Sequence, residues 1–183
     1  MLSLPDIEML FARHGASQYS GEPVTQLEHA LQTAHLAEQS DADDALVTAC
    51  LLHDLGHLLN PQGDTPSLRG IDDMHQYFAL PFLRGLLPDA VLEPIKLHVD
   101  AKRYLCCVNA GYFGRLSDDS KRSLALQGGM FIEAQAATFL SRSGAREAVL
   151  LRQWDDLAKQ DGLVTPSLAH FLARAARCVR VSA

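Results

Sequence analysis

The sequence predicts an all-α fold in which one helical bundle forms a single domain. Helix-capping signals and apolar positions with a period near 3.6 recur along the chain, whereas the residue-by-residue alternation of a half-buried strand does not. The 183 residues suffice for one domain with a buried core, and no linker, repeat or low-complexity segment divides them. In such a bundle, ligand sites are built from side chains on facing helices.

The expected helices follow from local signals in chain order. Thr25 and Glu28 form a capping box that opens a helix over 25–39. A second helix runs from about Asp43 to Leu55 and is ended by Gly56. The later segments are a surface loop over 60–70, helices over about 73–86, 88–102 and 118–127, two helices within 130–160 broken near Gly144, and a last helix from Thr165-Pro166 to about Cys178.

Composition excludes several classes of function. The formal charge of −6 and the pI near 5.7 argue against nucleic acid as the main partner and favour a small molecule or a protein. The apolar runs fall short of the roughly 20 residues of a membrane span, and no basic segment precedes the first apolar residues. The four cysteines form neither a disulfide framework nor a CxxC zinc motif. We therefore expect a cytoplasmic protein with reduced thiols.

The segment LLHDLGH (51–57) places two histidines and a carboxylate inside an apolar run. A buried carboxylate such as Asp54 loses its hydration and is costly unless it is paired, hydrogen-bonded or bound to a metal. A bound metal would satisfy both Asp54 and the adjacent His53. His57 lies four residues after His53, on the same helix face, where it would either bind the metal or support the groups that do.

Four further predicted helices carry side chains of the same chemical type. His29 lies in QLEHALQTAHLAE and Asp155 in RQWDDLAK, each on a helix that could turn this residue inward. His75 in DDMHQYF and His98 in IKLHVDAKRYL add two imidazoles. Asp156 is an alternative to Asp155, and the register of RQWD favours Asp155. Each histidine alone would more often be an ordinary one, and only their joint occurrence predicts a metal site.

The order of these residues along the chain resembles the pattern of the HD-domain superfamily of metal-dependent enzymes. A His-Asp dipeptide alone is weak evidence, because it arises often by chance, whereas HDLGH in a helix together with the other residues is specific. The positions that match the pattern are His29, His53, Asp54 and Asp155, and His75 and His98 resemble the additional ligands of dinuclear members.

Six segments carry a closer resemblance, to the oxygenases that cleave carbon–phosphorus bonds in 1-hydroxyphosphonates. They are YSGE (19–22), QLEHALQ (26–32), LLHDLGH (51–57), HVDAKRYL (98–105), LSDDSKRSLALQGG (116–129) and RQWDDLAKQ (152–160). The resemblance extends from about Tyr19 to Asp161. It implies one HD domain over 1–183 with a core over about 19–161, on which an N-terminal and a C-terminal helix are packed.

The resemblance also implies a cofactor, a mixed-valent Fe2+/Fe3+ pair of iron ions, with dioxygen as co-substrate. Residue spacing alone does not distinguish iron from another metal. Imidazole and carboxylate ligands with open positions suit an iron that binds both substrate and dioxygen. Carried over by position, the ligands of one iron are His29, His53, Asp54 and Asp155, and those of the other are Asp54 as a bridge, His75 and His98.

The implied substrate is 1-hydroxy-2-aminoethylphosphonate or its N-trimethyl analogue, which would give inorganic phosphate with glycine or glycine betaine. A phosphonate dianion needs a cation and several hydroxyl or amide donors. The resemblance assigns this end of the substrate to His57, Lys102, Ser120, Ser123 and Gln127. It assigns the positive nitrogen to Glu22, with Tyr19 beside it in a loop that could cover the open iron position. Tyr19, Glu22 and His57 are the implied catalytic side chains.

One residue departs from the family pattern. Asp100 stands where a small apolar residue is expected; if it faces the cavity it would favour a permanently cationic nitrogen, and if it faces solvent it has no such effect. Structural roles stay open for several residues: support of the metal ligands for His57, a solvated helix end for Lys102, a polar helix face for Ser120, Ser123 and Gln127, and an ordinary loop for Tyr19 and Glu22.

Two other functions compete with the oxygenase. The first is an HD-type metal-dependent phosphohydrolase, in which an activated water attacks the phosphorus of a nucleotide or another phosphate ester. The second is a degenerate HD domain that serves as a regulatory or interaction module and holds negligible metal. Dependence on oxygen separates the first from an oxygenase, and metal content separates the second. The oligomeric state stays open.

Overall fold

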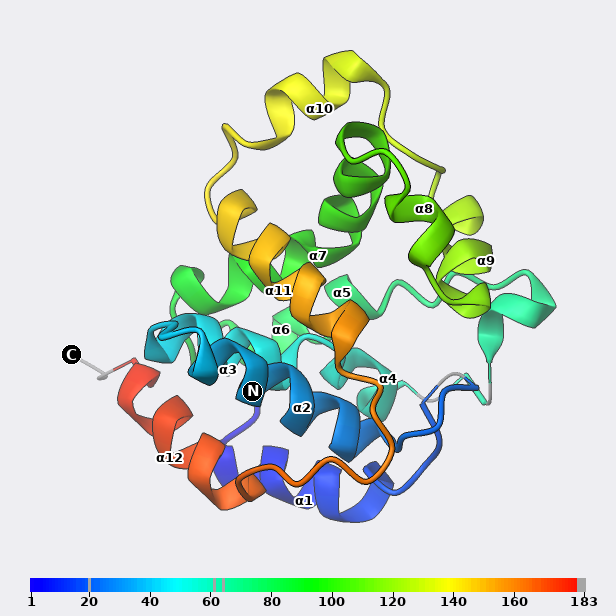
Figure 1. The fold of residues 1–183 in the computed structure, drawn as a ribbon. Helices are drawn as coiled ribbons and strands as arrows, with labels where there is room; N and C mark the ends of the chain where they lie inside the picture. The colour runs from blue at the N-terminus through cyan, green and yellow to red at the C-terminus, as the bar shows by residue number, and fades with distance from the viewer. Residues whose placement is uncertain (20, 61, 64, 181–183) are drawn as a thin grey trace.

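Four helices surround the interior of the protein, as the computed structural model shows for residues 1–19, 21–60, 62–63 and 65–180 (Figure 1). They are α2 (Gln26–Gln39), α3 (Asp44–Leu52), α7 (Asp89–Val108) and α11 (Ala145–Leu157). Helix α7 packs against α11 and α3, and α2 packs against α3 and α11. Apart from one isolated bridge between Gln18 and Thr25, no strand pairing occurs among the described residues, so the all-α prediction is confirmed.

The remaining helices cover this arrangement from outside. Helices α1 (Leu4–His14) and α12 (Leu168–Cys178) contact each other at one end of the bundle, and α10 (Glu133–Phe139) lies at the opposite end (Figure 1). Helices α8 (Tyr112–Arg115) and α9 (Asp118–Leu126) follow α7. The short elements between α3 and α7 are α4 (Leu55–Leu59), the 3-10 helix η1 (Pro66–Arg69), α5 (His75–Phe78) and α6 (Leu80–Leu83).

Local capping chemistry explains where the long helices begin. The Thr25 amide donates to the Glu28 carboxylate at 2.7 Å while the Glu28 amide donates to the Thr25 hydroxyl at 3.2 Å, which is the predicted capping box of α2. Asp43 caps α3 and Ser117 caps α9 through the same type of bond. These starts agree with the sequence prediction, because a cap is decided by residues three positions apart.

Several predicted boundaries differ from the structure. The helix expected over 43–55 breaks at His53 and Asp54, and the segment 73–86 divides into α5 and α6 with Pro81 in the first turn of α6. Helix α7 runs on to Val108 and contains Pro94. Helix α12 begins after a Ser167 cap instead of at Thr165-Pro166. Two of these differences have local causes, Pro81 in the first turn of α6 and the Ser167 cap of α12.

Gly56 does not end a helix, contrary to the prediction, but lies inside α4. A Cβ atom at this position would lie 2.2 Å from the carbonyl oxygen of His75, which real Cβ atoms essentially never approach so closely. Glycine therefore lets the backbone of α4 touch the backbone of α5. This close approach brings His53 and Asp54 next to His75.

We expect Gly56→Ala to destabilise the protein by roughly 1–3 kcal/mol, because the added methyl group must push α5 away from α4. The change in the free energy of unfolding is measured by urea denaturation. Gly114→Ala in α8 is the matched control, because its Cβ would have no atom within 4 Å. Equal stability of the two variants would contradict the close contact.

The main apolar core lies between α1, α3, α4, α7 and α12, and two smaller clusters lie near α10 and near α8 and α9. Each fully buried leucine, isoleucine or phenylalanine contributes roughly 1.5–3 kcal/mol, which offsets the cost of burying several charged groups.

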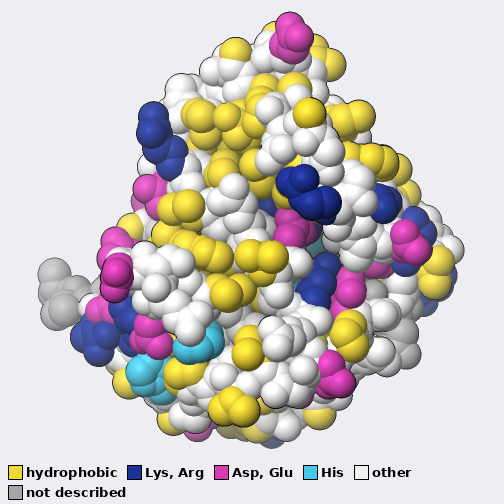
Figure 2. Space-filling model, viewed as in Figure 1, with side chains coloured by type: hydrophobic (Ala, Val, Ile, Leu, Met, Phe, Trp, Pro, Cys, Tyr) yellow, Lys and Arg dark blue, Asp and Glu magenta, His cyan; other side chains and the backbone are white. Residues whose placement is uncertain are grey.

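Apolar side chains also gather on the surface over α11 and α10 (Figure 2), and Leu150 and Leu157 of α11 are 44% and 68% exposed. No helix among the described residues is both long and apolar enough to cross a membrane.

Candidate metal centre and substrate pocket

The six residues predicted as metal ligands converge from four helices and one helix junction. His29 lies on α2, His98 on α7 and Asp155 on α11, and all three are buried. His53 and Asp54 occupy the break between α3 and α4, and His75 is the first residue of α5. The structure groups their ligand atoms as His29, His53 and Asp155 in one cluster and Asp54, His75 and His98 in another.

Asp54 lies between the two clusters and presents a different oxygen to each. Its Oδ2 atom is 3.6 Å from Nε2 of His29 and 3.3 Å from Nε2 of His53. Its Oδ1 atom is 3.4 Å from Nε2 of His75 and 3.7 Å from Nε2 of His98. A carboxylate in this position can bridge two metal ions.

The histidine rings turn their lone pairs toward one another. The Nδ1 atoms of His29, His53 and His98 donate to the carbonyl oxygens of Ala158, Cys50 and Ile95 at 2.8, 2.8 and 2.7 Å. Because a carbonyl only accepts, the hydrogen of each neutral ring is on Nδ1 and the Nε2 lone pair is free.

These lone pairs meet at short range. The Nε2 atoms of His29 and His53 are 3.2 Å apart, and those of His75 and His98 are 3.0 Å apart. Among the described residues, the buried Oδ1 atom of Asp155 has no hydrogen-bond partner. Acceptors that face one another without donors need a cation between them, so the donor set fits bound metal ions.

The electrostatics around Asp54, Asp155 and His53 favour positive charge. Burial would raise the pKa of Asp54, but the imidazoles of His53 and His57 hold this pKa well below its usual range. Burial likewise raises the pKa of Asp155, but the Arg152 guanidinium and the imidazoles of His29 and His53 together hold this pKa well below its usual range. Burial lowers the pKa of His53, yet the two carboxylates raise it to about 9. The field that stabilises a proton here would stabilise a metal cation in the same way.

Asp73 is part of the site although sequence reasoning missed it. Its carboxylate accepts from Nδ1 of His57 at 2.7 Å and from Nδ1 of His75 at 2.8 Å. Both rings are thereby held with Nε2 toward Asp54, and they stack at 4.2 Å between centroids. The signal in the sequence was an aspartate two residues before a predicted ligand, since ligating histidines usually donate their other nitrogen to a carboxylate or carbonyl.

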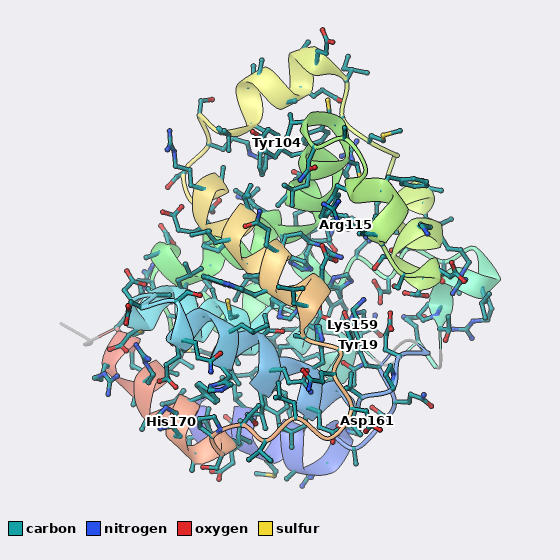
Figure 3. The ribbon with its side chains drawn as sticks, in the orientation of Figure 1. Tyr19, Tyr104, Arg115, Lys159, Asp161 and His170 are labelled. Atoms are coloured by element: carbon teal, nitrogen blue, oxygen red, sulfur yellow. The ribbon has the colours of Figure 1, made fainter. Side chains whose placement is uncertain are left out.

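We expect Asp73→Asn to weaken metal binding at the cluster of Asp54, His75 and His98 by about 10- to 100-fold. An asparagine amide offers one acceptor oxygen in place of two and would turn its NH2 group toward one of the imidazole N–H groups. Metal content after dialysis against graded chelator measures the effect. Asp161→Asn, at an exposed residue after α11 (Figure 3), is the control and should leave both metals bound.

A cavity of about 60 Å³ adjoins the two clusters and holds the residues predicted to bind a dianion. Lys102 is buried, and its Nζ atom donates to the Ser123 hydroxyl at 2.9 Å. The buried Oε1 atom of Gln127 has no partner among the described residues. The residues of the predicted phosphonate site that line the cavity are His57, Lys102, Ser120, Ser123 and Gln127.

Burial, together with the nearby charge of Arg152, lowers the pKa of Lys102 to about 7. We therefore expect affinity for a dianion to fall as pH rises above about 7, because free Lys102 loses its proton there and must regain it on binding. Sulfate suits the measurement, since it stays a dianion throughout, and calorimetric titration from about pH 6 to 9 gives its affinity. Lys102→Arg should flatten the profile because a guanidinium stays protonated. An unchanged profile would contradict the assignment.

Arg152 is a second residue that sequence reasoning missed as a functional group. It is 5% exposed, lines the cavity, and donates to Oδ2 of Asp155 at 2.7 Å. It also pairs with Asp156, which accepts from the Tyr112 hydroxyl. The structure thus places Asp155 in the metal cluster and Asp156 behind it. The spacing of three residues between Arg152 and Asp155 was the available signal.

Tyr19 and Glu22 differ in their position relative to the cavity. Tyr19 lines the cavity and stacks on His29 with ring centroids 3.8 Å apart. Burial raises the pKa of its hydroxyl well above the usual value, and the charges of Asp54 and Asp155 raise it further. The Glu22 carboxylate accepts from Nζ of Lys159 at 3.0 Å. Among the described residues, Glu22 is not part of the cavity lining.

Among the residues that the structure describes, Asp100 does not line the cavity, and it pairs with two arginines instead. Its carboxylate accepts from Arg103 at 3.2 Å and from Arg142 at 2.7 Å. Two cations neutralise it there. The outcome expected for an inward Asp100, a preference for a cationic substrate nitrogen, therefore has no structural basis.

Comparisons with known proteins point to one family. The family model of the HD domain matches residues 27–126. The hydroxymethylphosphonate dioxygenase of Gimesia maris is 47% identical over 174 residues, which cover 94% of this chain and 86% of the relative. The [1-hydroxy-2-(trimethylamino)ethyl]phosphonate dioxygenase (glycine-betaine-forming) of Leisingera caerulea is 35% identical over 170 residues, or 93% and 87% of the two chains. An uncharacterized protein of Acanthamoeba polyphaga mimivirus is 33% identical over 153 residues, or 82% and 69%.

Proposed function

This chain belongs to the HD-domain family, and from that premise we propose that it is an oxygenase that uses dioxygen to cleave the carbon–phosphorus bond of a 1-hydroxyphosphonate. The observation that carries the proposal is the position of Asp54 between two histidine clusters, at the wall of a cavity that presents Lys102 and several hydroxyl and amide groups. The names of two relatives, both phosphonate dioxygenases, support it.

The reaction balances without a further reductant. A 1-hydroxyphosphonate dianion and dioxygen give a carboxylate, hydrogen phosphate and one proton. The C–H, C–P, hydroxyl O–H and dioxygen O–O bonds break. One new C–O bond, the carboxylate double bond and one P–O bond form, one of the two hydrogens stays on the phosphate and the other leaves as the proton, and the carbon loses the four electrons that dioxygen gains. The substrate is a small-molecule phosphonate, and neither nucleic acid nor a membrane takes part.

We assign the two metals as iron in a mixed-valent Fe2+/Fe3+ pair. One would be held by His29, His53, Asp54 and Asp155, and the other by Asp54, His75 and His98; these residues provide the nitrogen and oxygen donors that suit iron. Bound iron would supply the binding and the reduction of dioxygen, which no side chain can perform.

The chain itself binds and orients the phosphonate. Lys102 and the hydroxyls of Ser120 and Ser123 would donate to the phosphonate oxygens, and the Gln127 amide and His57 would complete the set. Arg152 adds a second buried cation at the same wall. Tyr19 covers the metal cluster from the other side and excludes water until the substrate enters.

The four cysteines agree with a reducing compartment. All four are free thiols, and we place the reaction in the cytoplasm on that ground.

Phosphate release measured with and without oxygen tests the function. We expect protein purified without oxygen and loaded with iron to contain two irons per chain, to show a mixed-valent spin-resonance signal after partial oxidation, and to release phosphate from a 1-hydroxyphosphonate only when oxygen is present. Oxygen-independent release supported by manganese, cobalt or magnesium would indicate the phosphohydrolase instead. Negligible metal in protein from iron-rich medium would indicate a regulatory domain.

A further inference from the structure

We propose that Tyr112 is a positioning residue of the metal centre: it holds Arg152 so that this arginine occupies one oxygen of Asp155 and leaves the other for the metal. Asp156 takes part in the same arrangement. The inference rests on the metal-dependent function proposed above, because it requires a metal ion at Asp155. Tyr112 lies outside the six segments that carry the resemblance to known oxygenases, so the resemblance assigns it no role.

The guanidinium of Arg152 is held at all three of its nitrogens. Nη1 donates to Oδ2 of Asp155 at 2.7 Å, and Nη2 donates to Oδ1 of Asp156. Nε donates to the Tyr112 hydroxyl at 3.3 Å, and this hydroxyl donates to Oδ2 of Asp156. Tyr112 thereby closes a ring of hydrogen bonds with Arg152 and Asp156. A planar guanidinium bonded in this way cannot turn without breaking one of these bonds.

The orientation of Arg152 decides which oxygen of Asp155 is free. Oδ2 is taken by the arginine, whereas no donor among the residues that the structure describes reaches the buried Oδ1 atom. Oδ1 lies 3.4 Å from Nε2 of His29, which belongs to the same cluster. A carboxylate held in this way binds a metal ion through Oδ1 alone. A guanidinium that turned would be free to bond both oxygens and compete with the metal.

Asp156 preserves the negative charge of this ligand. Arg152 carries one positive charge and pairs with two carboxylates, so the three groups together keep one negative charge. Without Asp156 the arginine would neutralise Asp155, which would then attract a metal cation less strongly. Tyr112 bonds both members of the Arg152–Asp156 pair and therefore fixes it.

Tyr112 reaches this ring of hydrogen bonds from a different helix. It is the first residue of α8, and Gly111, with a φ of 84°, forms the turn that leads into α8. Its ring is buried, with the Arg115 guanidinium 5.9 Å from the centroid, and Figure 3 shows Arg115 between α8 and α11. Tyr112 and Asp156 line a surface groove of about 440 Å³, whereas Arg152 lines the inner cavity. The ring of hydrogen bonds therefore lies between the groove and the inner cavity.

Metal binding by Tyr112→Phe tests this role without a measurement of turnover. Metal-free protein is titrated anaerobically with Fe2+ in competition with a chromophoric chelator, which resolves the two binding steps. We expect Tyr112→Phe to weaken one step by about tenfold, because groups that support a metal ligand typically contribute 10- to 100-fold. The other step should keep its natural affinity. Asp73→Asn weakens the cluster that contains His75 and so identifies this other step.

A second variant shows whether the hydroxyl acts through Arg152. Arg152→Lys keeps the positive charge but lacks the fork that bonds two carboxylates and a hydroxyl together. We expect it to weaken the same step as Tyr112→Phe, and the double variant should be no weaker than Arg152→Lys alone. Tyr104→Phe is the matched control, because its ring packs on Phe139 at 5.1 Å near α10 (Figure 3), outside the cavity lining among the described residues. It should bind both irons with the natural affinities.

Natural affinity of Tyr112→Phe at both steps would overturn the positioning role. Equal weakening of both steps, or additive effects in the double variant, would overturn it as well, because the hydroxyl would then act on the whole fold or independently of Arg152. The oxygenase function fails on a different result. Two irons bound to the natural chain, with phosphate release that needs no oxygen, would refute the oxygenase and leave the role of Tyr112 intact.

Discussion

Replacing Asp54 with alanine should remove metal from both clusters and lower turnover by more than about 100-fold, since even the loss of a residue behind a metal ligand costs 10- to 100-fold. The reason is the position of this carboxylate: Oδ2 lies 3.3 Å from His53 and Oδ1 lies 3.4 Å from His75. Loss of any other single ligand would leave one cluster complete. Metal analysis of the purified variant, together with phosphate release, measures the effect.

Asp100→Ala is the matched control for this variant. Asp100 is also a largely buried aspartate, 16% exposed, but its partners are Arg103 and Arg142 instead of the histidines. It should retain both metals. Helical content measured by circular dichroism shows whether each variant folds. An Asp54→Ala protein that folds and still holds two metals per chain would refute the bridging role.

Lys102→Met should raise KM for the phosphonate by about 10- to 100-fold and leave both metals bound. A hydrogen bond to a charged group contributes about 1.5–3 kcal/mol, and about 1.4 kcal/mol corresponds to a factor of ten. The methionine fills a similar volume but offers neither a charge nor a donor. Steady-state kinetics and metal analysis of the same preparation separate loss of substrate binding from loss of the cofactor.

Stability gives a second readout for the Lys102 variant. A buried ammonium, with a pKa lowered to about 7, lacks the hydration it has in the unfolded chain. Lys102→Met should therefore leave the free energy of unfolding in the absence of substrate unchanged or higher. Lys121→Met on α9, where the lysine lies near the Phe113 ring outside the cavity, is the control and should keep the natural KM. A natural KM in Lys102→Met would exclude Lys102 from phosphonate binding.

The helix starts could be predicted from the sequence because they depend on short spacings, and the ligand set was implied by the resemblance to the HD-domain pattern. The capping box of Thr25 and Glu28 needs only residues three apart, and it starts α2 in the structure as predicted. The HDLGH segment and the separated histidines identify a metal site by residue type, because few buried environments other than a metal tolerate such groups together. The side chains predicted as ligands do meet in the structure.

What only the tertiary structure decided depends on contacts between helices distant in sequence. Gly56 looked like a helix end, but the backbone of His75 lies against it, so it continues α4. Glu22 looked like a free carboxylate for a substrate amine, but Lys159, 137 residues away, pairs with it. The contact between Asp73 and His57 could not be predicted from the sequence, because it depends on α4 and α5 lying side by side. Local periodicity specifies which face of a helix is apolar, whereas the partner of a buried charge is chosen only when the helices pack.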